Sequence, residues 1–497
     1  MISQRSYTLQ SATIRGIEAV PVLVEVVISN GIPSFSIVGM ADAAIMESRE
    51  RVKAALRASG FVMPTDKIVV NLAPGALRKT GSGFDLPIAL GILAATGQID
   101  PSVLEGAIVV GELSLSGAVR CTAGVLAYQK CAYENGWKLL TGVPDQGIFN
   151  FKGLECRFLE QLEHIRASRF VKAAPLKLGH SFASIDYKEV LGHEAAKRAL
   201  QIAAAGDHGV LMVGPPGSGK TMLAQRFSTI LPDLDESQRI EAALIHSVAG
   251  EDLSGILSGQ RPFRSPHHSA TAAGLIGGGR PPHPGEASLA HRGVLFLDEL
   301  AEFSTSVLQT LRQPMETGSI VLTRADGSYA FPARFQLIAA TNPCPCGYFG
   351  DANGKCRCAP AVVQAYQNRI GGPLMDRIDI RIDVWREESS DLFDHAEGKS
   401  SEELREGVIR ARRFSRKRRK GHAVRNRSLK VLKEECDFDQ ETERFFLSLA
   451  DGGQLSARSV AKTLLLSRTI ADIAQCDRVE VGHVAEAFNL RFGGVSQ

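Results

Sequence analysis

The stretch from Gly214 to Thr221 has the residue types and the spacing of a phosphate-binding loop of the Walker A kind. An apolar run at 210–213 predicts a buried strand before it, and the pattern after it predicts a helix. Glycines at such a turn let backbone N–H groups surround phosphate oxygens. A glycine-rich turn that binds nothing is the alternative, but both flanking elements favour a nucleotide. The residues expected to bind ATP are Gly214, Pro215, Pro216, Gly217, Ser218, Gly219, Lys220 and Thr221.

A second apolar run, at 294–297, ends in two acidic residues, Asp298 and Glu299. The pair is weak evidence alone, but its position downstream of the phosphate-binding loop strengthens it. We expect Asp298, with the Thr221 hydroxyl, to hold Mg²⁺. We expect Glu299 to orient and deprotonate the water that attacks the terminal phosphate. Together the two stretches predict an ATPase.

Four of the nine cysteines lie close together, as two Cys-x-Cys pairs joined by a glycine-containing loop. Four thiolates are the number that a structural zinc ion binds. The spacing within each pair is tighter than in most zinc sites, so reduced loop thiols are the alternative. The expected zinc ligands are Cys344, Cys346, Cys356 and Cys358.

Basic residues are concentrated in a helix-like segment from 405 to 427. A charge run is usually a solvated face, but this one is nearly all of one sign, which favours binding to nucleic-acid phosphates. Arg324, beside a hairpin turn at Asp326-Gly327, is a further candidate. The residues expected to contact DNA are Arg324, Arg412, Arg413, Arg416, Lys417, Arg418, Arg419 and Lys420.

A loop rich in glycine and proline at 265–286 contains the adjacent histidines His267 and His268. Adjacent histidines without a second pair seldom bind a metal. A contact with DNA or with a neighbouring subunit is therefore the favoured interpretation of this loop.

Composition limits the class of protein. The chain has 497 residues, of which 44% are hydrophobic and 22% charged, as in soluble proteins of two to four domains. The net charge of +3 means that affinity for DNA must come from local clusters. The N-terminus has no signal-peptide pattern, and the most apolar stretch, around 87–97, is too short to span a bilayer. With a cysteine usage that suits a reducing compartment, we expect a cytoplasmic protein without a membrane partner.

The order of the predicted elements divides the chain into four parts. Residues 1–165 alternate strands and helices, 166–186 have the composition of a linker, and 187–385 contain the ATPase motifs. Residues 386–497 combine the basic segment with helical patterns. The overall expectation is an α/β protein.

Longer motifs make the resemblance to a known family specific. The chain contains GSGFDLPIAL, VGELSLSGAVR, RPFRSPHHSA, RPPHPGEASLAHRGVLFLDEL, ATNPCPCGYFGD and LSARSVAKTLLLSRTIAD. With these it resembles the ComM/YifB branch of the magnesium-chelatase-like AAA+ proteins over nearly its whole length. The resemblance implies an N-terminal Lon-protease/S5-like α+β domain, a P-loop AAA+ core with a parallel sheet, and a C-terminal helical lid domain. It implies a hexameric DNA helicase that drives branch migration when donor DNA is integrated during natural transformation and homologous recombination.

The resemblance also implies roles for single residues. Asn342 would be the sensor that hydrogen-bonds the attacking water or the γ-phosphate, with a plain strand-end cap as the alternative. Arg377, or as second choice Arg369, would be the arginine finger that reaches a neighbour's γ-phosphate. Arg458 would be the second sensor, touching the phosphates of its own subunit.

The same resemblance predicts that the N-terminal domain is not catalytic. Lon-type enzymes use a serine and a lysine, and the corresponding positions here carry Gly83 and Leu126, with Ser82 one residue away. We therefore expect a scaffold or a DNA-facing collar. The alternatives for the whole chain are a magnesium-chelatase motor subunit or chaperone-like remodelling ATPase, a Lon-like protease, and a non-enzymatic DNA scaffold. The basic lid segment argues against the magnesium-chelatase subunit. The missing nucleophile argues against the protease, and the paired acids argue against the non-enzymatic scaffold.

Overall fold

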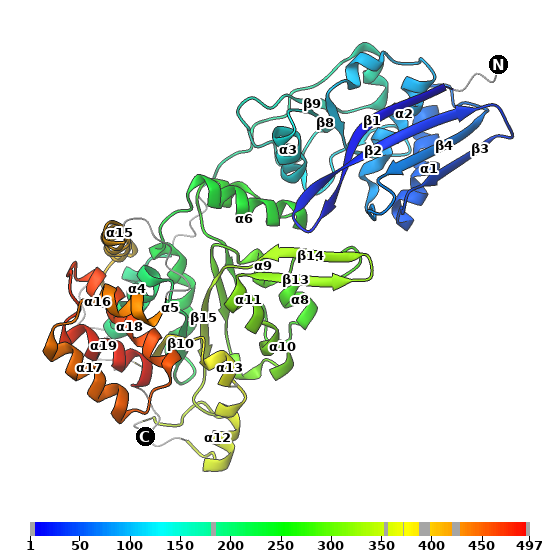
Figure 1. Ribbon diagram of the computed structural model, residues 1–497. Coiled ribbons are helices and arrows are strands. Elements are labelled where there is room, and N and C mark those ends of the chain that lie inside the picture. The colour runs from blue at the N-terminus through cyan, green and yellow to red at the C-terminus, as the bar shows by residue number, and fades with distance from the viewer. Residues whose placement is uncertain are drawn as a thin grey trace.

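The structure is a computed structural model, and it describes residues 5–179, 185–351, 356–370, 372–386, 398–419 and 428–493. It is an α/β protein with an N-terminal sheet, a second sheet that is wholly parallel, and a C-terminal group of helices (Figure 1). The expected fold class is confirmed. Among the described residues, every helix is too short or too polar to pass through a lipid bilayer.

The N-terminal region is built on a seven-stranded sheet with the order β3-β4-β2-β1-β5-β8-β9. Its two long strands form an antiparallel hairpin that turns at Gly16, whose φ of 68° favours glycine. Helices α1 and α2 pack on this sheet around a core of aliphatic side chains. The elements are β1 (Arg5–Arg15), β2 (Glu18–Ser29), β3 (Ser34–Val38), α1 (Ala43–Ala58), β4 (Lys67–Ala73), α2 (Asp85–Ala95), β5 (Ala107–Val109), β6 (Glu112–Leu113), β7 (Val119–Arg120), α3 (Val125–Glu134), β8 (Lys138–Gly142) and β9 (Cys156–Leu159).

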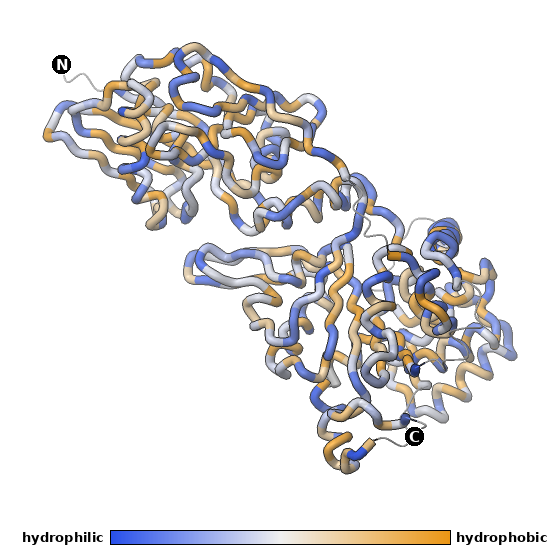
Figure 2. The backbone as a smooth tube through the Cα atoms, turned by 180° about the vertical axis from the view of Figure 1, so that it is seen from behind, coloured by the Kyte–Doolittle hydropathy of each residue, from blue (hydrophilic) through white to orange (hydrophobic). Residues whose placement is uncertain are grey.

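The second region contains a five-stranded sheet with the order β11-β12-β15-β10-β16, in which all neighbours are parallel. Strands β10, β12 and β15 are buried at every residue, as expected of a parallel sheet covered on both faces. Figure 2 shows these central strands coloured mainly as hydrophobic. The strands are β10 (Val210–Val213), β11 (Phe263–Arg264), β12 (Val294–Leu297), β15 (Gln336–Thr341) and β16 (Ile380–Asp383).

Helices and one hairpin complete this second region. The hairpin β13–β14 projects from the region toward the N-terminal sheet (Figures 1 and 2). The elements are α4 (Glu194–Gly206), α5 (Lys220–Arg226), α6 (Glu236–Ala249), α7 (Ser254–Leu257), α8 (Ala272–Ile276), α9 (Glu286–Leu289), α10 (Thr305–Thr310), α11 (Arg312–Thr317), β13 (Ser319–Arg324), β14 (Gly327–Pro332), α12 (Pro360–Asn368) and α13 (Gly372–Met375).

The C-terminal helices share a core with the second sheet. Leu404 of α15 and Leu466 and Ile470 of α18 belong to the same buried cluster as the residues of β10 and β16. A smaller cluster joins α16, α17, α18 and α19. The helical domain is therefore packed directly against the sheet. Its helices are α15 (Ser401–Arg418), α16 (Leu429–Cys436), α17 (Gln440–Gly452), α18 (Ala457–Ile473) and α19 (Val481–Phe492).

The N-terminal region is docked on α6 through α3. The N–H of Gly124 donates to the Ser247 carbonyl at 2.8 Å, and Leu126 is fully buried in a cluster with Ala242 and Ile245. The hairpin β13–β14 joins this cluster through Phe331. The position expected to correspond to a protease lysine is thus part of an apolar interface between two regions of the chain.

Candidate functional site

The loop between β10 and α5 is shaped by close backbone contacts. A Cβ atom on Gly214 would lie 2.0 Å from the Val384 carbonyl oxygen, so only glycine fits at this point. Gly217 and Gly219 have φ values of 75° and 87°, in the left-handed region. These glycines turn the chain sharply from the central strand into α5, a geometry in which backbone N–H groups can donate to an anion.

Lys220 folds back over this loop. Its Nζ donates to the carbonyl oxygens of Gly214 and Pro215, at 2.8 Å each, and lies 3.4 Å from Asn342 Oδ1 at the end of β15. Burial lowers the pKa of Lys220, although Asp298 acts in the opposite direction. The loop, the lysine and the predicted sensor thus meet at one edge of the sheet.

A hydroxyl and a carboxylate meet beside the lysine. Thr221 Oγ1 donates to Asp298 Oδ2 at 2.7 Å, although the two residues come from α5 and from the end of β12. Hard oxygen ligands of this kind suit Mg²⁺, so the residues present fit that ion. Glu299 follows with a φ of 50°, which is unusual for a residue with a side chain and directs it differently from its neighbour. All of these groups lie at the carboxyl ends of parallel strands, where ligands bind in open α/β sheets.

His268 contacts the acid pair, a contact that the sequence analysis missed. Its Nδ1 lies 3.1 Å from Glu299 Oε2, and its ring lies against His267 with the centroids 4.0 Å apart. A signal for this contact was available, because the histidines follow β11 and β11 pairs with β12. Residues that follow two paired parallel strands emerge at the same edge of the sheet.

The four predicted zinc ligands come together. Their sulfur atoms all lie within 4.8 Å of one another, and those of Cys344, Cys346 and Cys356 are 3.3–3.8 Å apart. A tetrahedral zinc ion with Zn–S bonds of about 2.3 Å requires sulfurs about 3.8 Å apart, so the set fits. Backbone N–H groups of Tyr348 and Arg357 lower the pKa of Cys346 to about 6, which favours the thiolate.

The cysteine loop packs on the phosphate-binding loop. A Cβ atom on Gly347 would lie 2.5 Å from Pro216 Cδ. Arg386 donates to the Pro216 carbonyl oxygen at 2.6 Å and lies over the ring of Tyr348, 5.9 Å from its centroid. The loop that follows β15 and the segment that follows β16 therefore support the glycine-rich loop from two sides.

Two of the predicted arginines lie at the opposite edge of the sheet. Arg377 and Arg458 line a cavity of about 490 Å³ with Gly209, the residue before β10. The four residues of β10 separate this edge from the glycine-rich loop by about 13 Å, at about 3.3 Å per residue. Arg458 therefore does not lie beside Lys220, contrary to the expected contact with phosphates of its own subunit. Arg377 is buried and paired with Glu316, whereas Arg369 is exposed after α12.

Three family models match the chain. "Magnesium chelatase, subunit ChlI" matches residues 186–392, "Subunit ChlI of Mg-chelatase" matches 24–144, and "Magnesium chelatase, subunit ChlI C-terminal" matches 398–491. The protein YifB of Salmonella typhimurium is 40% identical over 486 residues, which cover 96% of this chain and 95% of that protein. The competence protein ComM of Haemophilus influenzae is 39% identical, with the same coverage of both chains. The chain belongs to the YifB/ComM family. YifB of Escherichia coli, at 38% identity and the same coverage, is a further relative.

In this member of the YifB/ComM family, the described part of the basic segment 405–427 contains two kinds of side chain. Inward side chains contact other groups of the protein, and outward side chains are exposed. Arg412 donates to the Ala204 carbonyl and to Asp207 Oδ1, the latter at 2.6 Å, and Arg419 donates to the Ser415 carbonyl. Arg418 pairs with Asp472 at 3.1 Å. Arg413, Arg416 and Lys417 are exposed on α15, as is Arg324 at the end of β13. Lys420 lies outside the described residues.

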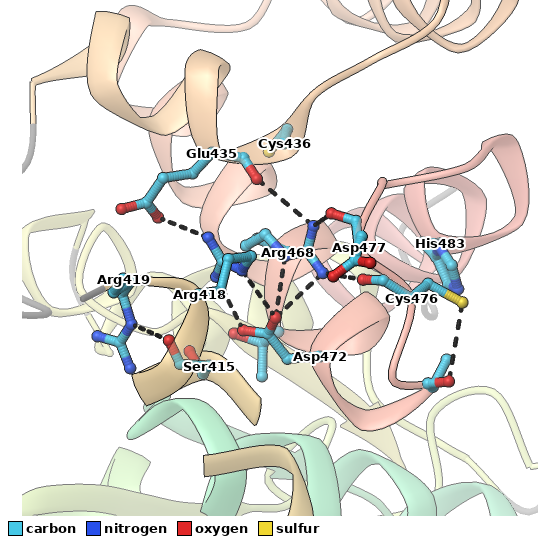
Figure 3. A network of polar contacts seen from close by, with 12 residues as sticks. Ser415, Arg418, Arg419, Glu435, Cys436, Arg468, Asp472, Cys476, Asp477 and His483 are labelled. Carbon is cyan, nitrogen blue, oxygen red and sulfur yellow. Dashed lines mark hydrogen bonds and ion pairs between the residues drawn. The ribbon is translucent and has the colours of Figure 1, made fainter. Parts of the chain in front are cut away.

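Arg418 and Arg468 form a network that connects helices of the C-terminal domain (Figure 3). Arg468 is 2% exposed and donates through Nε to Asp472 Oδ1 at 3.1 Å and through Nη1 to the Asp477 carbonyl at 2.7 Å. Arg418 contacts the other Asp472 oxygen and lies 3.6 Å from Glu435. Asp472 thus balances guanidinium groups of two helices, α15 and α18.

Replacing Asp472 by Asn should destabilise the C-terminal helices by about 3–5 kcal/mol, because it leaves the buried Arg468 without its charge partner and removes the shorter of the two ion pairs of Arg418. The measurement is urea unfolding followed by the helical circular dichroism signal. Asp477→Asn is the control, since the contact of Asp477 with Arg468 is made by its main-chain carbonyl. Equal midpoints for the two variants would contradict the assignment of Asp472 as the central acid.

Proposed function

We propose that the chain is an ATP-hydrolysing DNA translocase that assembles into a ring and drives branch migration when donor DNA is integrated in natural transformation and homologous recombination. The observation that carries this proposal is the set of groups at the carboxyl edge of the second sheet, where Lys220, Thr221, Asp298, Glu299 and Asn342 converge. The relative named as a competence protein supports the biological setting.

Each group at this edge has a distinct part in hydrolysis. Lys220 would leave the loop carbonyls to bind the terminal phosphates, and Thr221 and Asp298 would hold Mg²⁺. The ion, when bound, neutralises charge on the phosphates. Glu299 would take a proton from the attacking water while Asn342 orients that water. Positioning and electrostatics, rather than covalent chemistry, then account for most of the rate.

Distance within the chain supports the ring. Arg377 lies at the other edge of the sheet, about 13 Å away along β10. It is therefore too far from its own glycine-rich loop to stabilise charge there. A neighbouring subunit, in a hexamer for example, brings such an arginine to the next nucleotide, after it has left Glu316. Arg458 lines the same cavity and would face the same neighbour.

DNA would be held through its backbone. Arg413, Arg416 and Lys417 are exposed on one helix, and Arg324 is exposed beside a hairpin turn. Contacts with phosphates carry no sequence information, which suits the movement of a junction through arbitrary homologous arms. The inward residues Arg412 and Arg418 would act only by holding α15 in place.

A magnesium-chelatase motor subunit is the second candidate, because the family models that match the chain carry that description. Such a subunit would use the same nucleotide edge. The exposed cations of α15 would then have no nucleic-acid partner.

Purified protein should move synthetic three- and four-stranded DNA junctions in the presence of ATP and Mg²⁺. Lys220→Ala should lose nucleotide binding and junction movement, and Glu299→Gln should bind ATP but hardly hydrolyse it. Arg57→Ala, an exposed change on α1, is the control. Gel analysis of labelled junctions and phosphate release are the measurements. ATPase-active protein that leaves both junctions unmoved but stimulates metal insertion into a porphyrin would favour the chelatase candidate.

Removing the contact between His268 and Glu299 should release the catalytic carboxylate. We expect His268→Ala to raise the DNA-independent kcat by up to about fivefold without changing KM for ATP, since a partly exposed polar contact of this kind contributes at most about 1 kcal/mol. His267→Ala is the matched control, because its ring lies against His268 and its Nδ1 is hydrogen-bonded to Ser269 Oγ at 2.8 Å instead of contacting the acid. A fall in kcat would instead mean that His268 assists Glu299.

We also propose that the four cysteines hold a structural zinc ion. Protein purified without chelators should contain about one zinc per chain, and Cys346→Ser with Cys356→Ser should abolish it. Elemental analysis is the measurement, and Cys436→Ser, a buried cysteine elsewhere, is the control. Metal-free wild-type protein would identify the four residues as reduced thiols.

A further inference from the structure

A cavity of about 590 Å³ lies where the N-terminal region meets the second region. Three arginines from distant parts of the sequence line it: Arg78 after β4, Arg280 after α8, and Arg324 at the end of β13. Much of the remaining wall consists of small residues, among them Ala43, Gly81 and Ala325. This combination leaves room for a bulky anion between cationic groups.

The two acidic residues of the cavity are engaged within the protein. Asp42 is the N-cap of α1 and accepts a hydrogen bond from the Ile45 N–H at 3.0 Å. Its other carboxylate oxygen accepts a hydrogen bond from the Gly81 N–H at 3.1 Å. Asp326 accepts the Tyr329 hydroxyl at 3.1 Å and lies 3.6 Å from Arg78.

The arginines are less engaged than these acids. Within the described part of the chain, the side chains of Arg280 and Arg324 have no hydrogen-bond or ion-pair partner, and both residues are exposed. Arg78 is also exposed, and its ion pair with Asp326 is long. The cavity therefore presents guanidinium groups that can still accept an anionic ligand.

Both walls of the cavity are fixed. On the N-terminal side, the buried Lys79 donates to the carbonyl oxygens of Leu72 and Gly39, at 2.7 and 3.0 Å, and so holds the segment that carries Arg78. On the other side, Arg15 lies over the Tyr329 ring, 5.4 Å from its centroid, and ties the hairpin to the N-terminal sheet. The segments that carry Arg78 and Arg324 are thus held near one another before any ligand arrives.

We propose that this three-arginine cavity binds the phosphodiester backbone of a DNA strand, so that Arg78 of the N-terminal region is a DNA contact. The inference deepens the proposed function, on which it rests, because it adds the N-terminal region to the surface that contacts DNA. A guanidinium matches a phosphate in charge and geometry. No aromatic side chain is among the described residues that line the cavity, so base stacking has no platform and the contact is independent of sequence.

The test is equilibrium binding of a fluorescein-labelled single strand to the full chain without ATP, followed by anisotropy over a range of salt concentrations. Arg78→Ala should weaken binding several-fold at low salt. It should also reduce the slope of log K against log salt by about 0.7, the value for one phosphate contact on a single strand. Inorganic pyrophosphate at the same total phosphate concentration should not compete with the DNA strand. Full competition would overturn the proposal of a DNA strand as the ligand and would favour a small anion.

Two further variants separate phosphate binding from a structural role. Asp326→Asn breaks the same ion pair, but it removes negative charge from the cavity, so DNA should bind at least as tightly as to the wild type. Arg57→Ala, on α1, should leave both affinity and slope unchanged. An unchanged slope in Arg78→Ala, or an equal loss in Asp326→Asn, would overturn the inference.

The same measurements distinguish this inference from the proposed function. If the wild-type protein moves junctions but Arg78→Ala binds DNA normally, the DNA contact at the cavity is rejected and the proposed translocase is retained. Protein that binds DNA through Arg78 but never moves a junction would reject the translocase and retain the cavity.

Discussion

The complete burial of the three central strands of the parallel sheet is the constraint on which the candidate site depends. Strands β10, β12 and β15 have no exposed residue, so the first polar groups after each strand emerge together at the carboxyl edge. Lys220, Asp298 and Asn342 are far apart in sequence but within reach of one another for this reason. The same parallel arrangement sends the segments before each strand to the other edge, where Arg377 and Arg458 lie. One sheet thus separates the groups that would serve its own nucleotide from those that would serve a neighbour's.

Sequence was informative where a motif coincides with the end of an apolar strand. The glycine-rich loop, the acid pair and the four cysteines could be located from spacing alone. The cysteines come together because only a short loop separates the two pairs, whereas the glycine-rich loop and the acid pair meet because both follow buried parallel strands. Strand β1 was not predicted, since its buried positions include Ser11 and Thr13 rather than a clear alternation of apolar residues. Its partner β2 has the valine-rich pattern that sequence analysis can detect.

Contacts between distant segments were harder to predict. The basic segment has one composition, but Arg412 and Arg418 point inward only because Asp207 and Asp472 happen to face them from other elements. The position of Arg458 depends on how α18 packs against the start of the sheet, which no local pattern encodes. His268 and Glu299 meet through the pairing of β11 with β12, and that pairing is a tertiary property.

The interface at Leu126 limits which side chains this position can carry. The side chain is fully buried among Ala242, Ile245 and other apolar groups of α6. A lysine there would bring an ammonium group into an apolar contact, at a cost of several kcal/mol unless it lost its proton or found a new partner. Docking of the N-terminal region on α6 therefore disfavours a charged side chain at position 126. The contact that attaches the two regions thus also restricts the chemistry that this position could supply.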